Sequence, residues 1–382
     1  MTKSSFQIGE LLIVELEHFQ QLLDALWNRD FAVYGPTVKD MAIVHDEVKA
    51  VYDFPIGWTD EQEAAHYQLK KTGNGALFNY VVGPHTWKKY LFPPKVSLWE
   101  AKKEGALFEI LPDKSSPPKM AFIGIRACDL SAIMIQDNIF TKGDYKDSIY
   151  LRNRKNNFIL AVNCTKSGGG CFCISMGTGP KATKGFDLAL TEIIDDKRHY
   201  FLFEVGSELG GEILSQVTTQ AAGETEKQTV EKAINQAKNQ MGRALDTRGI
   251  KELLYDNSEH PRWDDVASRC LTCGNCTMVC PTCFCSNIED YTDLTGKLAN
   301  RQRRWDSCFT LEHSYIHGGS VRSSVKARYR QWLTHKFASW IDQFGTSGCV
   351  GCGRCITWCP SGIDVTEEIK EIRRSVKVST AV

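Results

Sequence analysis

Short apolar runs recur through the first half of the chain and are separated by longer segments of mixed polarity. The runs are rich in β-branched and aromatic residues, which is typical of buried strands: residues 31–34, 41–45, 120–125, 158–162 and 200–205. The segments between them have helical patterns bounded by Gly and Pro. This alternation predicts an α/β domain over residues 1–215.

The pattern changes after residue 215. Residues 215–248 are rich in Gln, Glu, Lys and Ala, which predicts an exposed helix in a linker over residues 216–262. Beyond Trp263 no strand pattern stands out, and residues 294–344 predict helices interrupted at Gly318 and Gly319. The predicted fold class is therefore mixed α+β: an N-terminal α/β domain, the helical linker, and an α-helical domain over residues 263–382.

The net charge does not indicate a binding partner, because 46 Lys and Arg residues offset 46 Asp and Glu residues. A neutral chain without a reading motif is not expected to bind nucleic acid. No run approaches the roughly 18 apolar residues of a membrane span, and the first residues lack the pattern of a secretory signal. We therefore expect a cytoplasmic protein without a membrane span.

Fifteen cysteines are the unusual feature of the composition. Their odd number and clustered spacing favour thiolates that bind metal over disulfides. Eleven of them lie between Cys270 and Cys359. The other four lie in the first half of the chain: Cys128, Cys164, Cys171 and Cys173.

A duplicated four-cysteine run is the strongest motif. Both copies have the spacing Cys-x2-Cys-x2-Cys-x3-Cys-Pro, which is that of bacterial ferredoxins with [4Fe-4S] clusters. In such a run three thiolates hold one cluster and the fourth holds the other. We therefore expect one cluster on Cys270, Cys273, Cys276 and Cys359, and the other on Cys349, Cys352, Cys355 and Cys280.

Two observations qualify this motif. Cys-x2-Cys pairs also suit tetrahedral zinc, so a pair of zinc sites is the alternative. The separation between the two copies is far larger than in a compact ferredoxin, which favours an α-helical ferredoxin-like domain. Residues 297–336 carry nine basic side chains, which would either stabilise the reduced clusters or form a solvated helical face: Lys297, Arg301, Arg303, Arg304, Arg322, Lys326, Arg328, Arg330 and Lys336.

The four N-terminal cysteines suggest a third cluster. Cys128 and Cys164 each follow a predicted strand, so parallel neighbours would bring both thiols to one sheet edge. Cys171 and Cys173 follow a run of three glycines that could curl round a cubane. We expect these loops alone to form a [4Fe-4S] site, with structural or free thiols as the alternative. Asp129 is an oxygen ligand, a group that supports the ligands without binding the metal, or, more often for an Asp in this place, the cap of a helix that begins at Leu130.

Three cysteines remain outside both sets, namely Cys283, Cys285 and Cys308. They could hold an extra centre together with His313 or His317. Because the duplicated motif already completes two clusters, we expect them to be buried free thiols.

Several segments resemble one known family: residues 125–130, 163–164, 171–173, 176–180 and 185–188, together with 280–285 and 349–355. They are similar to the iron–sulfur chain that sulfhydrogenases (as their β chain) and anaerobic sulfite reductases share, over residues 90–362. The resemblance implies cluster ligation and a place in a hetero-oligomer. Its expected partners are a flavoprotein that oxidises NAD(P)H and a catalytic partner, either a nickel–iron hydrogenase or a sulfite reductase.

Three functions are compatible with the sequence. The first is a non-catalytic electron-transfer subunit, since the sequence has clusters but neither a Gly-x-Gly-x-x-Gly nor a Gly-x4-Gly-Lys-Ser/Thr loop. The second is a self-sufficient reductase with its own flavin or substrate site, for which His66, His85 and Tyr90 are candidates. The third, an iron–sulfur sensor or scaffold, needs only one labile cluster. The sequence favours the first, with no catalytic residue assigned.

Overall fold

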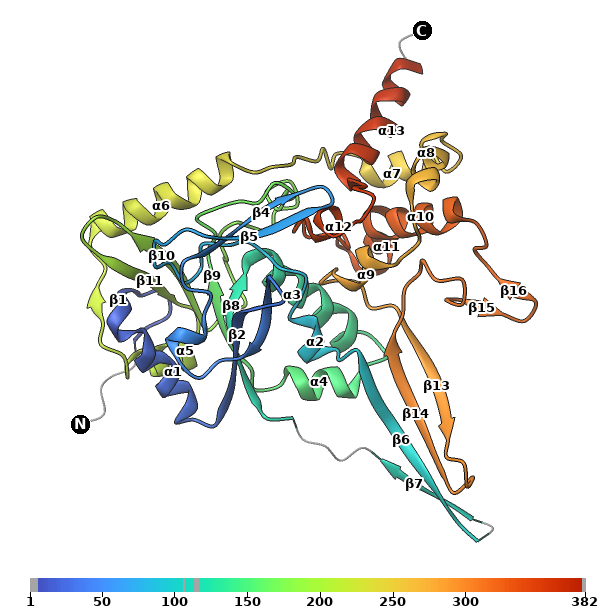
Figure 1. Ribbon diagram of the computed structural model, residues 1–382, viewed down its shortest axis with the longest axis horizontal. Helices are drawn as coiled ribbons and strands as arrows, with labels where there is room; N and C mark the ends of the chain where they lie inside the picture. Colours follow the sequence, from blue (N-terminus) through green and yellow to red (C-terminus); the bar gives the residue numbers. More distant parts are fainter. Residues whose placement is uncertain (1–5, 106, 113–116, 380–382) are drawn as a thin grey trace.

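The computed structural model describes residues 6–105, 107–112 and 117–379. Its largest element is an eight-stranded sheet in the order β12-β1-β11-β10-β9-β8-β2-β3 (Figure 1). Strands β2, β8, β9 and β10 run parallel, and the outer strands pair antiparallel. The strands are β1 (Leu11–Glu15), β2 (Phe31–Lys39), β3 (Ala42–Glu47), β8 (Lys119–Arg126), β9 (Phe158–Val162), β10 (Leu188–Ile194), β11 (His199–Val205) and β12 (Gln220–Ala221).

Both faces of this sheet are buried, which explains the continuous apolar runs of the sequence. In β9, Phe158 and Leu160 face one core, while Ile159 and Ala161 face the other. Helices α1 (Phe19–Trp27) and α5 (Glu208–Leu214) pack into the first core. Helices α2 (Lys88–Leu91), α3 (Ala127–Thr141) and α4 (Ser148–Arg154) pack into the second. All five predicted strands are thus confirmed.

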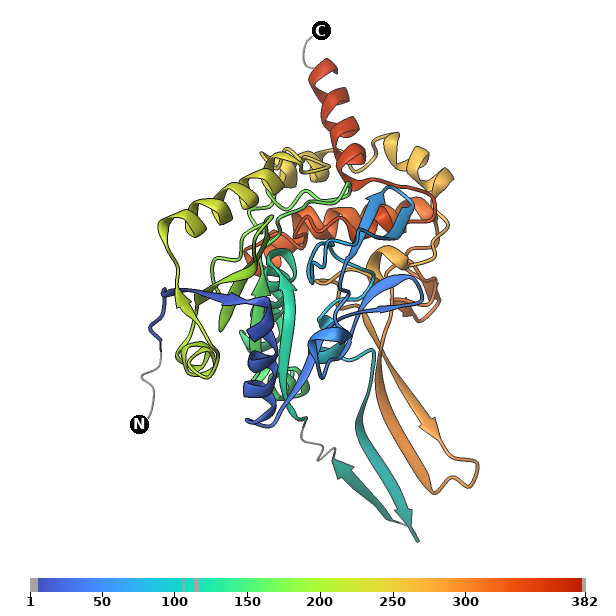
Figure 2. The ribbon, with the colours of Figure 1, turned by 60° about the vertical axis from the view of Figure 1, so that its left-hand side comes forward.

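Helix α6 (Glu224–Asn239) lies where an exposed bridging helix is predicted, but it is not fully exposed. Val230 and Ile234 pack on Ile13 and Leu202 of the sheet. The helix is amphipathic, with Val230, Ile234 and Ala237 buried and polar residues on its exposed face. It runs over one end of the sheet (Figure 2).

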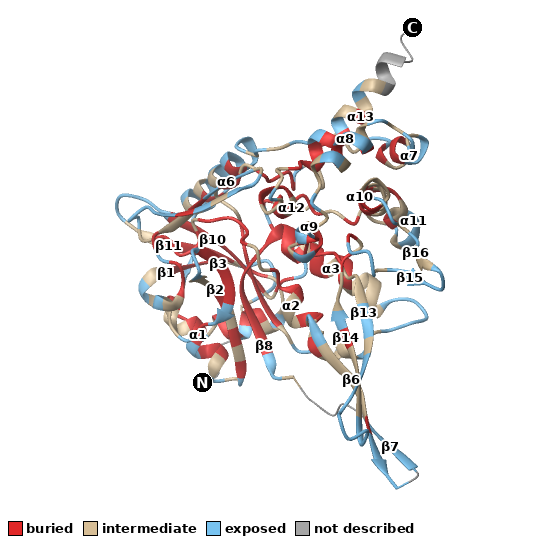
Figure 3. Ribbon diagram, turned by 45° about the vertical axis from the view of Figure 1, so that its right-hand side comes forward, coloured by how far each residue is buried: buried red, intermediate tan, exposed pale blue. Residues whose placement is uncertain are grey.

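A four-stranded antiparallel sheet contradicts the helices predicted over residues 294–344. It has the order β13-β14-β6-β7 and projects from the body as an arm with mostly exposed residues (Figure 3). Its strands come from distant parts of the chain: β6 (Lys95–Glu104), β7 (Leu107–Pro112), β13 (Ser286–Thr292) and β14 (Leu298–Trp305). Two further hairpins are β4–β5 (Trp58–Glu63, His66–Lys71) and β15–β16 (Tyr315–Ile316, Gly319–Ser320).

The remaining C-terminal elements are helical, and they pack around Trp263, Tyr329 and Trp332. They are α7 (Ile250–Asp256), α8 (Arg262–Arg269), α9 (Asn275–Met278), α10 (Val325–Thr334), the π-helical η3 (His335–Ser339), α11 (Trp340–Phe344), α12 (Arg354–Thr357) and α13 (Val365–Ser379). The mixed α+β class is confirmed. The division at residues 215 and 262 stays a prediction. None of the helices that the structure describes is long and apolar enough to cross a membrane.

Candidate iron–sulfur centres

The two cysteine runs have the same local fold. Each contains a glycine with positive φ that precedes a four-residue helix: Gly274 (φ 76°) before α9 and Gly353 (φ 78°) before α12. Two residues after the first cysteine of each run, a backbone N–H donates to that cysteine's Sγ. The distances are 3.5 Å from Thr272 to Cys270 and 3.4 Å from Gly351 to Cys349. Such N–H groups stabilise negative charge on cluster sulfur.

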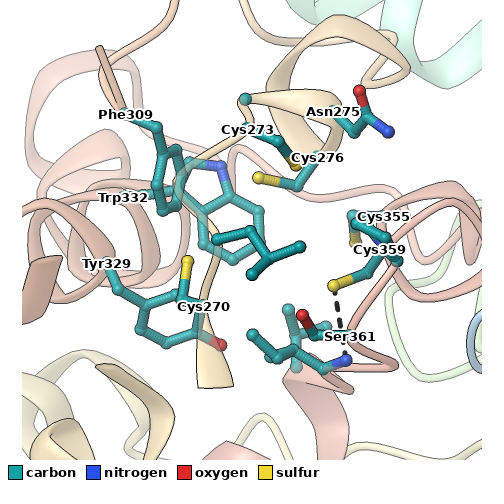
Figure 4. A pocket seen from close by; sticks show the side chains of 15 residues that line it. Cys270, Cys273, Asn275, Cys276, Phe309, Tyr329, Trp332, Cys355, Cys359 and Ser361 are labelled. Atoms are coloured by element: carbon teal, nitrogen blue, oxygen red, sulfur yellow. Dashed lines mark hydrogen bonds between the residues drawn. The ribbon is translucent and has the colours of Figure 1, made fainter. Parts of the chain in front are cut away.

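One cavity is lined by the first predicted set of four cysteines (Figure 4). Cys270, Cys273 and Cys276 come from the first run, and Cys359 comes from the second. The Cys359 Sγ accepts the N–H of Ile363 at 3.4 Å. Phe309, Tyr329 and Trp332 form an aromatic wall of the cavity, while Cys273 is exposed.

A second cavity is lined by Cys349, Cys352 and Cys355 of the second run and by Cys280 of the first. Each cavity is thus lined by three cysteines of one run and the fourth cysteine of the other, while the assignment of ligands to clusters stays a prediction. Cys355 lines the two cavities at once, so the two sites are immediate neighbours.

Burial shapes the electrostatics of these thiols. It raises the pKa of Cys276 and Cys355 well above the usual thiol value, and it raises the pKa of Cys349 to about 12. Buried thiolates therefore need a cation beside them. Iron bound in the cavities would supply that charge.

Among the residues that the structure describes, no three His, Cys, Asp or Glu side chains converge on the geometry of a single metal ion. Thiols that hold a cubane stand further apart, because each of them bonds a different iron atom.

Only part of the basic segment 297–336 lies beside a cluster cavity, where positive charge would stabilise a reduced cluster. Lys336 is buried beside the second cavity, where its Nζ donates to Thr282 Oγ1 and to the Gly348 carbonyl, both at 3.0 Å. Arg301 and Arg304, in contrast, lie on β14 and pair with the carboxylates of Asp290 and Glu289 on the arm. Nothing in the sequence distinguishes Lys336 from the others.

The N-terminal cysteines meet where the strand pattern predicts. β8 and β9 are parallel neighbours, Cys128 lies in the first turn of α3 directly after β8, and Cys164 follows β9. Cys164 faces the buried Arg126, whose guanidinium lies 3.9 Å from its Sγ. Cys128, Cys171 and Cys173 share one buried cluster with Cys352.

This group is not formed by N-terminal loops alone, which corrects the sequence-based expectation. The Phe172 N–H donates to the Gly351 carbonyl at 2.8 Å, and the Cys171 thiol lies 4.0 Å from the Cys352 carbonyl oxygen. A Cβ on Gly351 would stand 2.6 Å from the Phe172 carbonyl oxygen. The second ferredoxin run therefore forms one wall of the N-terminal site.

Asp129 is not the helix cap that the sequence favours, but it supports the residues around the cysteines. Helix α3 begins at Ala127, so Asp129 lies inside the first turn and is not the cap. Both of its oxygens accept from Arg354 of the second run, at 2.7 and 2.8 Å, and both side chains are almost fully buried. The ion pair binds the N-terminal site to the second cavity, a link that spacing in the sequence does not reveal.

His66, His85 and Tyr90, the candidates for a reductase site, have structural positions. The Tyr90 hydroxyl donates to the His45 carbonyl at 3.2 Å, and its ring packs on Tyr34 and Phe122. The His85 carbonyl accepts from Arg354, and His66 is exposed at the start of β5.

The three remaining cysteines are not all buried, contrary to expectation. Cys283 is buried, but Cys285 and Cys308 are partly exposed. Cys285 lies within hydrogen-bonding reach of Cys308 and His313, while His317 is exposed.

Comparison with known proteins agrees with this geometry. Residues 269–363 match the 4Fe-4S dicluster domain. Sulfhydrogenase 2 subunit beta of Pyrococcus furiosus is 30% identical over 292 residues, which are 76% of this chain and 83% of that subunit. No solved structure matches the chain at a significant level.

These findings define an iron–sulfur electron-transfer protein whose dicluster domain implies two [4Fe-4S] clusters. More particularly, the chain belongs to the family of the sulfhydrogenase β subunit.

Proposed function

We propose that the chain relays electrons between a flavoprotein subunit that oxidises NAD(P)H and a catalytic subunit of nickel–iron hydrogenase or sulfite reductase type. The observation that carries this proposal is the adjacency of its sites. The first cysteine cavity shares Cys355 with the second, and the second shares Cys352 with the N-terminal cysteines. Each cluster gains or loses one electron when bound, so three sites in contact would form a continuous path.

The proposed ligands are the two exchanged sets of four, together with a third [4Fe-4S] cluster on Cys128, Cys164, Cys171 and Cys173. The chain's own residues insulate and bias these sites. Aromatic side chains line the first cavity, backbone N–H groups donate to Cys270, Cys349 and Cys359, and Lys336 adds positive charge at the second.

A hetero-oligomer is supported by two observations. The relative is named as one subunit of a sulfhydrogenase. On the arm, strand β7 exposes apolar side chains, among them Leu107, Phe108 and Ile110 at 76, 63 and 65%. An exposed apolar group of this size is typical of a protein–protein contact. Native mass spectrometry of the complex purified through this chain would identify the subunits bound to it.

Substitution of the fourth cysteine of each run directly tests whether that cysteine binds the cluster of the other run. Cys280→Ser should alter the EPR signal of the reduced cluster held by Cys349, Cys352 and Cys355, and Cys359→Ser should alter the other. If Cys280→Ser instead removed the signal assigned to Cys270, Cys273 and Cys276, the exchange would be wrong.

The same proposal predicts that the isolated chain carries electrons but catalyses no reaction. It should accept electrons from an artificial donor but should reduce neither sulfite nor protons and oxidise no NAD(P)H. Steady turnover by the single purified chain would favour a self-sufficient reductase.

A further inference from the structure

A cavity of about 340 Å³ lies beside the two cluster cavities and belongs to neither of them. Its walls come from the segment after the first cysteine run, from the loop that follows β14, and from α10 and η3. The titratable and charged side chains that line it are Cys283, Cys285, Cys308, His313, Arg322, His335 and Lys336.

Cys285 stands at the centre of a constellation in this cavity. Its thiol lies within hydrogen-bonding reach of both Cys308 and His313. On the far side of the imidazole, His313 Nδ1 lies 2.7 Å from Asp306 Oδ2, which leaves Nε2 as the nitrogen for Cys285. The other Asp306 oxygen accepts from the Ser307 N–H at 2.7 Å and the Thr310 hydroxyl at 3.0 Å, so the carboxylate is fixed.

This order of groups is the one that activates a nucleophile: a thiol, an imidazole that holds its proton, and a carboxylate that orients the imidazole. A second thiol in contact with the first adds the means to resolve a covalent intermediate. The backbone holds the arrangement together, because the Asp306 N–H donates to the Cys285 carbonyl at 2.9 Å.

The surroundings of Cys285 differ from those of the cluster cysteines. The thiols of Cys270 and Cys359 accept backbone N–H groups and line a cavity with their partner cysteines. Cys285 also accepts a backbone N–H, that of Cys308, but in addition it has a second thiol and an imidazole within hydrogen-bonding reach.

Protonation states agree with this geometry. The Cys308 thiol first, and then His313, lower the pKa of Cys285 by hydrogen bonding, against the opposite effect of burial. The Cys285 thiolate and then Asp306 raise the pKa of His313 to about 9, although burial alone would lower it. At neutral pH the pair is therefore a thiolate and an imidazolium.

We propose that Cys285 and Cys308 form a redox-active dithiol that reduces a small anionic disulfide bound in this cavity. Both thiols are partly exposed, so a small molecule can reach them. Arg322 and Lys336 on the wall, together with His313, favour negative charge in the ligand.

The reaction balances without any other oxidant. The Cys285 thiolate attacks one sulfur of the disulfide, that S–S bond breaks, and the first leaving thiolate takes the proton of His313. Cys308 then gives its proton to His313 and attacks the Cys285 sulfur of the mixed disulfide. The second leaving thiolate takes that proton, and a Cys285–Cys308 disulfide remains. Two protein thiols are oxidised, and one disulfide is reduced to two thiols.

Return to the dithiol takes two electrons and two protons. This half of the cycle rests on the proposed relay, since Cys283, on the wall of the same cavity, contacts the Cys280 thiol of the second cluster cavity. The first half does not depend on the relay and can be tested by itself.

The test uses the full-length holoprotein under anaerobic conditions, reduced beforehand and desalted, with 5,5′-dithiobis(2-nitrobenzoate) as the anionic disulfide. Peptide mass spectrometry should find a Cys285–Cys308 disulfide in the wild type, with two aromatic thiolates released per chain at this site. Cys308→Ser should stop at a mixed disulfide on Cys285 with one released, and Cys285→Ser should leave position 308 unmodified.

The pH profile separates a positioning role of His313 from a structural one. In wild type the rate at Cys285 should stay nearly flat from pH 6 to 8, whereas in His313→Gln it should be at least tenfold lower at pH 6 and recover as the pH rises. Other groups with charge or titration near Cys285 are Lys88, Cys283, Arg322, His335 and Lys336. His335→Gln removes the other imidazole of the cavity and should leave the profile unchanged.

Three results would overturn the proposal: no adduct at Cys285, a profile in His313→Gln identical to wild type, or the loss of about four iron atoms in Cys285→Ser or Cys308→Ser, which would indicate a further cluster. If Cys308→Ser failed to fold, the absence of the Cys285–Cys308 disulfide in wild type would still refute it. A failed relay would leave this exchange intact, so the two proposals fail separately.

Discussion

Lys336 brings a single positive charge to the edge of the second cavity. Burial alone would lower its pKa, but the neighbouring cysteines Cys280, Cys283 and Cys349 hold that pKa above its usual range. The ammonium group therefore stays charged in a region with little water. A fixed cation beside a cluster stabilises the reduced state, which carries one more negative charge.

Replacement of this lysine should change a redox potential. Lys336→Met should lower the midpoint potential of the cluster in the second cavity by on the order of 100 mV, the size of one nearby charge at an effective dielectric constant of about 20. Potentiometric EPR titration would measure the shift. Lys326→Met is the matched control on α10, because Lys326 pairs with Asp264 at the surface. Equal potentials in wild type and Lys336→Met would contradict this account.

The arm shows why the sequence does not predict some of the strands. The strands of the large sheet were predictable because both of their faces are buried, so each is a continuous apolar run. β14 has the sequence Leu-Ala-Asn-Arg-Gln-Arg-Arg-Trp, in which only Arg303 is buried. Its pairing with β6 depends on a strand some 200 residues earlier in the chain, and no local pattern records it.

The contact between the second run and the Cys171 loop is also an element that spacing could not reveal. Gly351 has a φ of 64°, and its α-carbon faces the Phe172 carbonyl and the Cys173 N–H. Gly345 at the end of α11 has a similar φ of 70°, but a Cβ there would meet nothing within 4 Å. Substitution of Gly345 would introduce backbone strain alone, whereas substitution of Gly351 would introduce both strain and a steric clash.

Alanine at these two positions should have unequal effects. Gly345→Ala should lower the free energy of unfolding by about 1 kcal/mol through strain alone. Gly351→Ala should lower it by roughly 3 kcal/mol or more, since the new Cβ must also displace the Cys171 loop. Urea unfolding of the holoprotein, followed by circular dichroism, would measure both. Equal losses would mean that the loop yields freely and that the contact is not tight.

At the scale of the whole molecule, the three cysteine sites form a single row that two halves of the chain build together. The dicluster domain was predictable from the duplicated motif, because the spacing of that motif is local. The strand ends revealed how Cys128 and Cys164 meet. The shared wall at Gly351 and the buried Asp129–Arg354 pair were not predictable, since each joins residues that are far apart in sequence.

This shared wall determines how the third cluster must be tested. A fragment that ended before the second run would lack Gly351 and Arg354, so the experiment requires the full chain. If Cys128, Cys164, Cys171 and Cys173 bind a cubane, the anaerobically purified chain should hold about 12 iron atoms, and about 8 if they are free thiols. Metal analysis against protein concentration separates these values.

The double variant Cys171→Ser/Cys173→Ser should hold about 8 iron atoms and keep the EPR signals of both ferredoxin-type clusters. It should also lose electron transfer to one partner of the complex, because the N-terminal site, which lies next to Cys352, would no longer hold a cluster. Cys308→Ser is the control, since that thiol lies outside the three sites and should leave the iron content at about 12. A wild-type chain that holds only about 8 iron atoms, even after reconstitution, would leave the N-terminal cysteines as free thiols and end the relay at the second cavity.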